Sequence, residues 1–227
     1  EKQWSAKYTN LGSSEAIMLN SFSDNKGSTF STGSYYSYAD EMLNMNYFLV
    51  KHNEDGTVAW NILYNSKNGN PADGIIGKAD TNGNVYVGLI PSFEQSPSKL
   101  KLIKLSPEGS QIWVKQIDWS NSSAFVLTPL ADGSLYFSGR SGNAIVGIKY
   151  NADGTEAWKT SVPGIAGQVN TANVNSNGQL TLTTRNFAAV QFNTNGTINW
   201  TAPVSIPGQT ITASDMHIAK DGSVYIN

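Results

Sequence analysis

Apolar and polar residues alternate along most of the chain in short runs, and turns that contain glycine separate these runs. The stretch "NYFLVKHNEDGTVAWNILYN" (46–65) shows one run on either side of Gly56. Alternation with a period of two is typical of strands that bury one face, and an Asx–Gly type of turn between two such runs indicates a β-hairpin. The pattern predicts almost no helix and a first set of strands at about 15–23, 28–34, 46–53 and 57–64.

Two hairpin signals recur along the sequence. In one, a tryptophan follows a turn glycine by four positions, and Trp4 takes the tryptophan position of a partial copy; the full copies are Gly56/Trp60, Gly109/Trp113, Gly154/Trp158 and Gly196/Trp200. The other has a turn glycine before an alternating strand, at Gly27, Gly83, Gly133, Gly178 and Gly222. Glycine tolerates the positive φ that such hairpin turns require. Two hairpins per repeat predict a four-stranded antiparallel sheet.

The repeated unit predicts how the sheets are joined. A small sheet cannot bury both faces alone, so we expect the tryptophan of each repeat to pack against the neighbouring sheet. Four-stranded units repeated every ~40 to 55 residues are typical of a β-propeller. We predict a single all-β propeller domain over 1–227, with complete blades at about 11–65, 73–118, 123–163 and 167–205.

The two ends of the sequence carry complementary parts of one more blade, with a hairpin at 209–227 and a lone outer strand within 1–8. Closing a ring within one blade hides exposed strand edges. We therefore predict about five blades with both termini in the same one, and pairing between residues 2–8 and 222–227. The alternative is that the chain is a segment of a larger propeller.

The stretch "GSTFSTGS" (27–34), followed by "NYFLVKHNEDGTVAWNILYN", resembles the bacterial SBBP repeat, a β-propeller repeat. The resemblance extends over nearly the whole chain and is weakest in the fourth copy, "GQLTLTTR". The spacing from glycine to tryptophan is also similar to that of PQQ-like propeller repeats. The resemblance implies an exported bacterial protein, secreted or at the cell surface, and it supplies no catalytic residues.

Composition narrows the function classes. The net charge is −2, which argues against nucleic-acid binding, and no apolar run approaches the length of a membrane span. The absence of cysteine excludes thiolate nucleophiles and cysteine metal sites. "DTNGN" at 80–84 resembles the start of a calcium loop, but Pro91 stands where such a loop needs glutamate. We expect no metal and no cofactor.

The candidate ligand-binding residues lie in connections opposite the glycine turns. If the strands of each sheet are labelled a to d from the inside out, the glycine turns share one face, and the b–c and d–a connections share the other, here called the long-loop face. Insertions at 33–46, 91–99 and 118–123 carry aromatic residues suited to glycan stacking or protein contact, namely Tyr35, Tyr36, Tyr38, Phe93 and Trp119. The alternative is that these side chains fold back over blade edges.

Arg140 and Arg185 each follow a turn glycine by seven positions, so they occupy equivalent ends of b strands in adjacent sheets on the long-loop face. Two neighbouring guanidinium groups could clamp a carboxylate or a sulfate. Solvated strand ends are the alternative.

These patterns favour a non-enzymatic binding or adhesion module of a secreted or surface-exposed bacterial protein, which binds a protein or glycan partner at the long-loop face. One alternative is a structural subunit of a surface filament or appendage, with the loops serving self-association. Another is an enzyme that resembles quinoprotein dehydrogenases, which need a larger ring, a bound quinone and a calcium site.

Overall fold

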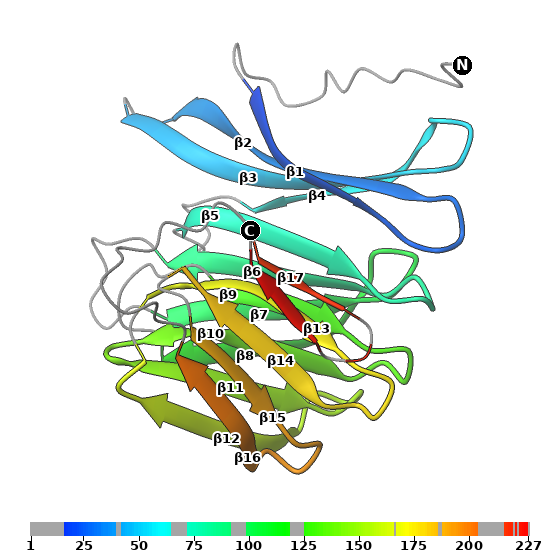
Figure 1. The fold of residues 1–227 in the computed structure, drawn as a ribbon. Helices are drawn as coiled ribbons and strands as arrows, with labels where there is room; N and C mark the ends of the chain where they lie inside the picture. The colour runs from blue at the N-terminus through cyan, green and yellow to red at the C-terminus, as the bar shows by residue number, and fades with distance from the viewer. Residues whose placement is uncertain are drawn as a thin grey trace. The chain divides into compact units, whose positions relative to one another are not determined.

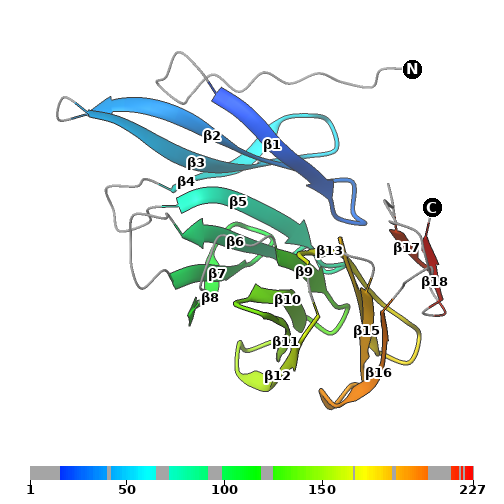
Figure 2. The ribbon, with the colours of Figure 1, turned by 60° about the vertical axis from the view of Figure 1, so that its left-hand side comes forward.

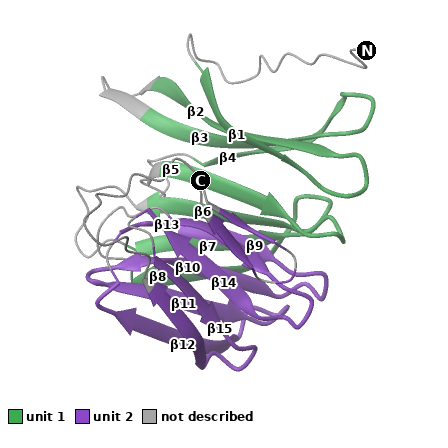
Figure 3. Cartoon of the chain, viewed as in Figure 1, with its two compact units in different colours: residues 1–122 green, residues 123–227 purple. Residues whose placement is uncertain are grey.

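A computed structural model describes most of the chain, and every regular element in the described part is a β-strand (Figure 1). The described residues are 16–39, 42–64, 72–91, 99–118, 125–165, 167–185, 188–203, 216–219, 221 and 223–226. The chain divides into two compact units, residues 1–122 and 123–227 (Figure 3). The expectation of almost no helix is confirmed for the described residues.

The described residues of unit 1 form two four-stranded antiparallel sheets, each with its strands in chain order. The first sheet contains β1 (Ala16–Ser23), β2 (Thr29–Ala39), β3 (Met42–His52) and β4 (Val58–Tyr64). The second contains β5 (Ala72–Ala79), β6 (Val85–Pro91), β7 (Lys99–Leu105) and β8 (Gln111–Asp118). The first set of predicted strands is therefore correct, except that β2 and β3 extend further than expected.

Unit 2 contains two further four-stranded sheets and one two-stranded sheet. The third sheet contains β9 (Phe125–Pro129), β10 (Leu135–Ser141), β11 (Ala144–Tyr150) and β12 (Glu156–Pro163). The fourth contains β13 (Val169–Val174), β14 (Leu180–Thr184), β15 (Ala188–Phe192) and β16 (Ile198–Pro203). The fifth contains β17 (Met216–Ile218) and β18 (Val224–Ile226).

The repeated antiparallel sheets are the blades of a β-propeller fold, and the four full sheets and one small sheet of the described residues agree with about five blades. Within the units, first strands lie beside one another, β1 beside β5, and β13 beside both β9 and β17. This is the arrangement expected of inner strands. Trp4 and the predicted pairing of residues 2–8 with 222–227 lie outside the described residues, so that closure stays a prediction.

The hydrophobic core lies between successive sheets of each unit. In unit 1, Phe30 and Leu49 of the first sheet pack with Val87 and Ile103 of the second. In unit 2, the corresponding cluster contains buried residues of the third and fourth sheets, among them Tyr136, Ile145, Leu180, Leu182, Val190 and Phe192. Each sheet thus buries one face against the next sheet in its unit.

The c–d turn of the first sheet shows why the repeat needs glycine. The Asn53 N–H donates to the Thr57 carbonyl at 2.9 Å, and the Gly56 N–H donates to the Asn53 carbonyl at 2.9 Å. Gly56 has a φ of 85°, in the left-handed region that favours glycine. A β-bulge follows the turn, because Lys51 pairs with Trp60 whereas His52 pairs with Val58. The same register shift occurs in all four full sheets.

The tryptophan after this bulge reaches the c–d turn of the next sheet. Trp60 Nε1 donates to the Pro107 carbonyl at 2.9 Å, and Trp158 Nε1 donates to the Thr194 carbonyl at 3.0 Å. A Cβ on Gly109 would lie 3.0 Å from the Trp60 ring, and one on Gly196 would lie 2.6 Å from the Trp158 ring. The turn glycine therefore provides positive φ and also leaves room for the incoming indole. Trp113 is buried, and the other three repeat tryptophans, Trp60, Trp158 and Trp200, are half-buried.

A second repeated feature, which the sequence analysis did not identify, lies across the strands of the first three sheets. Lys51 pairs with Phe30 on one side and with Trp60 on the other. Its ammonium lies 5.7 Å from the centroid of the Phe30 ring. Lys104 lies over Tyr86 and Lys149 lies over Tyr136, both at 5.4 Å. Each lysine thus covers an aromatic ring of the b strand and forms a cation–π contact.

The contact between tryptophan and turn predicts unequal costs for two glycine substitutions. Gly196→Ala should destabilise the chain by ~3 kcal/mol or more, because it adds a clash with Trp158 to the strain at positive φ. Gly164→Ala is the matched control, since Gly164 has a φ of 78° and open space around its Cβ position. It should cost about 1 kcal/mol, the strain alone. Urea unfolding monitored by tryptophan fluorescence measures the stability of both variants. Equal losses of stability in Gly196→Ala and Gly164→Ala would contradict the proposed role of the indole.

Tyr64 supports a prediction about alkaline pH. Its side chain is buried, its hydroxyl has no hydrogen-bond partner among the described residues, and burial raises its pKa above the usual value of 10.0. Because the folded pKa exceeds the unfolded one, this group's contribution to stability is complete below pH 10 and is lost as pH rises further. Tyr64→Phe should keep or raise stability by about 1 kcal/mol at neutral pH, and should reduce the loss above about pH 10. Urea unfolding of the original chain and of the Tyr64→Phe variant, at neutral pH and above about pH 10, tests this prediction. A large loss of stability in the variant at neutral pH would show that the hydroxyl is needed.

Candidate functional site

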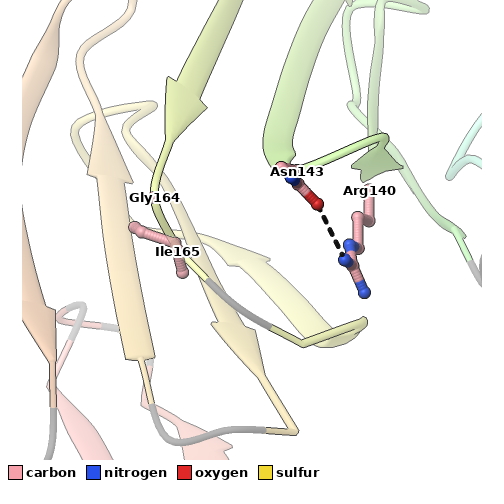
Figure 4. Close-up of a pocket in the computed structure, with 4 residues that line it drawn as sticks. All are labelled: Arg140, Asn143, Gly164 and Ile165. Carbon is pink, nitrogen blue, oxygen red and sulfur yellow. Dashed lines mark hydrogen bonds between the residues drawn. The ribbon is translucent and has the colours of Figure 1, made fainter.

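A cavity of about 210 Å³ lies in unit 2, at the b–c turn of the third sheet and the connection that leaves it (Figure 4). Its lining residues are Arg140 of β10, Asn143 of the turn between β10 and β11, and Gly164 and Ile165 after β12. Figure 4 shows Arg140 and Asn143 on one side and Gly164 and Ile165 on the other. The cavity lies on the long-loop face of this unit, away from the glycine turns.

The short turn after β10 fixes the arginine side chain. β10 and β11 pair as far as Ser141 and Ala144, and Gly142 takes a φ of 60° between them. Arg140 Nε donates to the Gly142 carbonyl at 2.8 Å, and Arg140 Nη2 donates to Asn143 Oδ1 at 3.4 Å. No carboxylate of the described residues forms an ion pair with Arg140. An arginine has five N–H donors, so the turn orients this one and leaves donors for a ligand.

The opposite wall is apolar. Ile165 is half-buried and packs against the hydrophobic core of unit 2, which fixes its position. Gly164 adds no side chain, so the wall is open at this point. The cavity therefore combines a fixed positive charge with an apolar surface, an arrangement that suits an anionic group attached to an apolar or amphipathic body.

Arg185, the second predicted arginine, directly follows β14 and is exposed. Its backbone N–H donates to the Gln168 carbonyl at 2.9 Å. Gln168 belongs to the same connection between β12 and β13 that supplies Ile165. The two arginines therefore border opposite ends of one connection, in adjacent sheets of the same unit.

The structure does not place the aromatic residues predicted to bind a ligand together at one site. The prediction of a loop over 33–46 is wrong, because β2 and β3 stay paired from Tyr36 with Met45 to Ala39 with Met42. Tyr35 is only 6% exposed and packs with Phe48 and Val50, so it belongs to the core and not to a binding surface. Tyr36 is half-buried. The side chain of Tyr38, together with Phe93 and Trp119, lies outside the described residues.

Asn143 and Ile165 were not among the predicted site residues. A signal for Asn143 was present, since "RSGNA" places a glycine turn directly after Arg140 and turns the chain back beside it. Nothing local points to Ile165, whose position depends on packing between sheets. In the described part of the chain, no group of three or more His, Asp or Glu residues could hold a metal ion, and no helix is long and apolar enough to cross a membrane.

Comparisons with known proteins concern the fold alone. No protein-family model and no curated protein matches the sequence. The fragment HIRA(644-1017) aligns with 86% of this chain, at 12% identity and a TM-score of 0.49, and the chain spans 57% of that fragment. The alignment with a luciferin-regenerating enzyme covers 92% of this chain and 83% of the enzyme's chain, at 12% identity and a TM-score of 0.48. The alignment with BamB from Moraxella catarrhalis covers 93% of this chain and 99% of the BamB chain, at 9% identity and a TM-score of 0.30. The fold assignment rests on the sheets described above.

Proposed function

We propose that this chain is a non-enzymatic binding module that holds an anionic group of a protein or glycan ligand in the Arg140 cavity. The observation that carries the proposal is the pairing of an oriented guanidinium with an apolar wall in one cavity. A planar guanidinium can bind a carboxylate or a sulfate through two parallel N–H bonds. Arg185, at the other end of the same connection, adds positive charge to this region.

The chemistry of the lining favours binding over catalysis. The guanidinium of Arg140 and the amide group of Asn143 provide hydrogen bonds to a ligand but no nucleophile. Gly164 and Ile165 contribute no reactive group. The cavity can therefore bind and orient an anion, but its own lining offers no nucleophile and no general base.

We also propose that the module belongs to a secreted or surface-exposed bacterial protein and acts in adhesion. The support for this is the resemblance of its repeats to SBBP repeats and a composition with only 14% charged residues. Ser, Thr, Asn and Gly then provide much of the surface, which suits hydrogen bonding to glycan hydroxyls.

A binding screen with matched variants tests the proposal. The purified chain is applied to a glycan array that includes uronic-acid and sulfated glycans, and to a set of acidic peptides. Arg140→Ala should weaken binding of the best ligand by roughly tenfold, and adding Arg185→Ala should weaken it further. Lys159→Ala is the control, because it removes an exposed positive charge from β12, outside the cavity lining.

Urea unfolding should give the same stability for these variants, since Arg140 and Arg185 lie at strand ends and have no ion-pair partner among the described residues. The proposal fails if a ligand binds the glycine-turn face, or if the lysine variant weakens binding as much as the arginine variants do.

A further inference from the structure

The guanidinium of Arg140 offers only one of its edges to a ligand. Its Nε–Nη2 edge faces the chain's own turn, because Nε donates to the Gly142 carbonyl at 2.8 Å and Nη2 donates to Asn143 Oδ1 at 3.4 Å. The N–H groups of Nη1 and the second N–H of Nη2 have no partner among the described residues. Nη1 and Nη2 form the end edge of the planar group, and its two parallel N–H bonds match the two oxygens of a carboxylate.

Asn143 adds a further donor to the same side of the cavity (Figure 4). Its Oδ1 accepts from Arg140, which fixes the orientation of the amide group. Its Nδ2 is therefore the donor that remains, and it has no partner within the described part of the chain. This side of the cavity thus presents N–H groups and one positive charge, so it suits an anion that accepts several hydrogen bonds.

The size of the cavity limits what it can enclose. Its volume is about 210 Å³. Pockets that enclose a drug-sized ligand measure about 300–1,000 Å³. The Arg140 cavity therefore accommodates a group of about one residue, and the rest of a longer ligand stays outside it. A carboxylate and an apolar group can both reach its walls only if they lie close together in the ligand.

The opposite wall accepts an aliphatic group. Gly164 and Ile165 belong to the connection from β12 of the third sheet to β13 of the fourth (Figure 2). Beyond its chain neighbours, no atom lies within 4 Å of the Cβ position of Gly164, so there is space next to Ile165. An aliphatic side chain placed there gains contact with Ile165. A hydroxyl placed there loses its hydrogen bonds to water and gains no partner from an isoleucine.

The last residue of a polypeptide matches both walls. Its Cα carries the terminal carboxylate and the side chain together, so an anion and an aliphatic group are joined through one carbon. A uronic acid or a sulfated sugar carries its anionic group on a ring with several hydroxyls. Either sugar would place hydroxyls against the apolar wall. The cavity therefore favours a peptide terminus over a glycan.

We propose that the Arg140 cavity binds the free C-terminus of a polypeptide partner that ends in Val, Leu or Ile. The terminal carboxylate accepts from the Nη1–Nη2 edge of Arg140 and from Asn143 Nδ2, and the terminal side chain contacts Ile165. This inference rests on the function proposed above and names the class of ligand for the same site.

Short peptides titrated into the full chain test the inference. A hexapeptide of alternating glycine and serine that ends in leucine is used as the free acid and as the C-terminal amide, with the amide chemical shifts of the isotope-labelled chain as the readout. The free acid should shift the resonances of residues 140–143 and 164–165 in a saturable way. The amide should bind roughly tenfold more weakly, because it lacks the charge and one acceptor oxygen. Changing the terminal leucine to serine should weaken binding roughly fivefold.

Variants of the chain connect this binding to the arginine. Arg140→Ala should weaken binding of the free acid roughly tenfold and leave binding of the amide unchanged, a difference that a structural role of Arg140 would not produce. Lys159→Ala is the matched control and should change neither, because this exposed lysine lies outside the cavity lining. The apolar wall is tested by changing the peptide, so Ile165 and its contacts with the core stay intact.

Equal affinity for the acid and the amide, or for the leucine and serine ends, would overturn the inference. So would equal binding of an amidated peptide with an internal aspartate, since the site would then accept any carboxylate. If a uronic-acid or sulfated disaccharide binds in a way that depends on Arg140, and the peptide acid does not, the anion site stands and the polypeptide partner is wrong. If no probe binds in a way that depends on Arg140, the proposed function fails as well.

Discussion

The contact between a tryptophan of one sheet and the c–d turn of the next is the interaction on which the rest of the structure depends. It requires three features together, a bulge that aims the tryptophan, a carbonyl that accepts its N–H, and a turn residue without a Cβ. Glycine satisfies the last requirement and also the positive φ of the turn. Replacing it therefore affects both the fold of one sheet and its packing against its neighbour.

This contact also determines where a binding site can lie. Both hairpin turns of a sheet lie at the same end, as the approach of Gly27 to Glu54 and of Gly178 to Thr194 shows. That end is constrained by packing between sheets, so its sequence has little freedom. The opposite end carries connections whose lengths differ from sheet to sheet, and there Arg140, Asn143 and Ile165 can form a cavity without disturbing the repeat.

The sequence predicted the parts of the fold that depend on local chemistry. Gly56 and Trp60 could be assigned to a turn and a strand because their spacing recurs and the turn requires positive φ. The extension of β2 and β3 was missed, because "YADEMLNMN" is compatible with a helix and only its partner strand decides its conformation. Lys51 was missed because a lysine on a strand ordinarily faces solvent, and its contact with Phe30 is visible only across the sheet. Ile165 was missed because it reaches the cavity through packing between sheets.

The departure of the fourth repeat from the pattern has a physical counterpart in the sheet that it forms. Thr181 and Gln191 replace the aromatic residue and the lysine, so hydrogen bonds replace the burial of a large ring on that face. A hydrogen bond contributes about 1 kcal/mol net, whereas burial of an aromatic side chain contributes ~2–3 kcal/mol, so this face is the less cohesive one. Thr183 lowers the stability of this face further, because its hydroxyl is buried without a hydrogen-bond partner among the described residues. Among the described residues, this less cohesive face belongs to the sheet that lies beside the two-stranded fifth sheet.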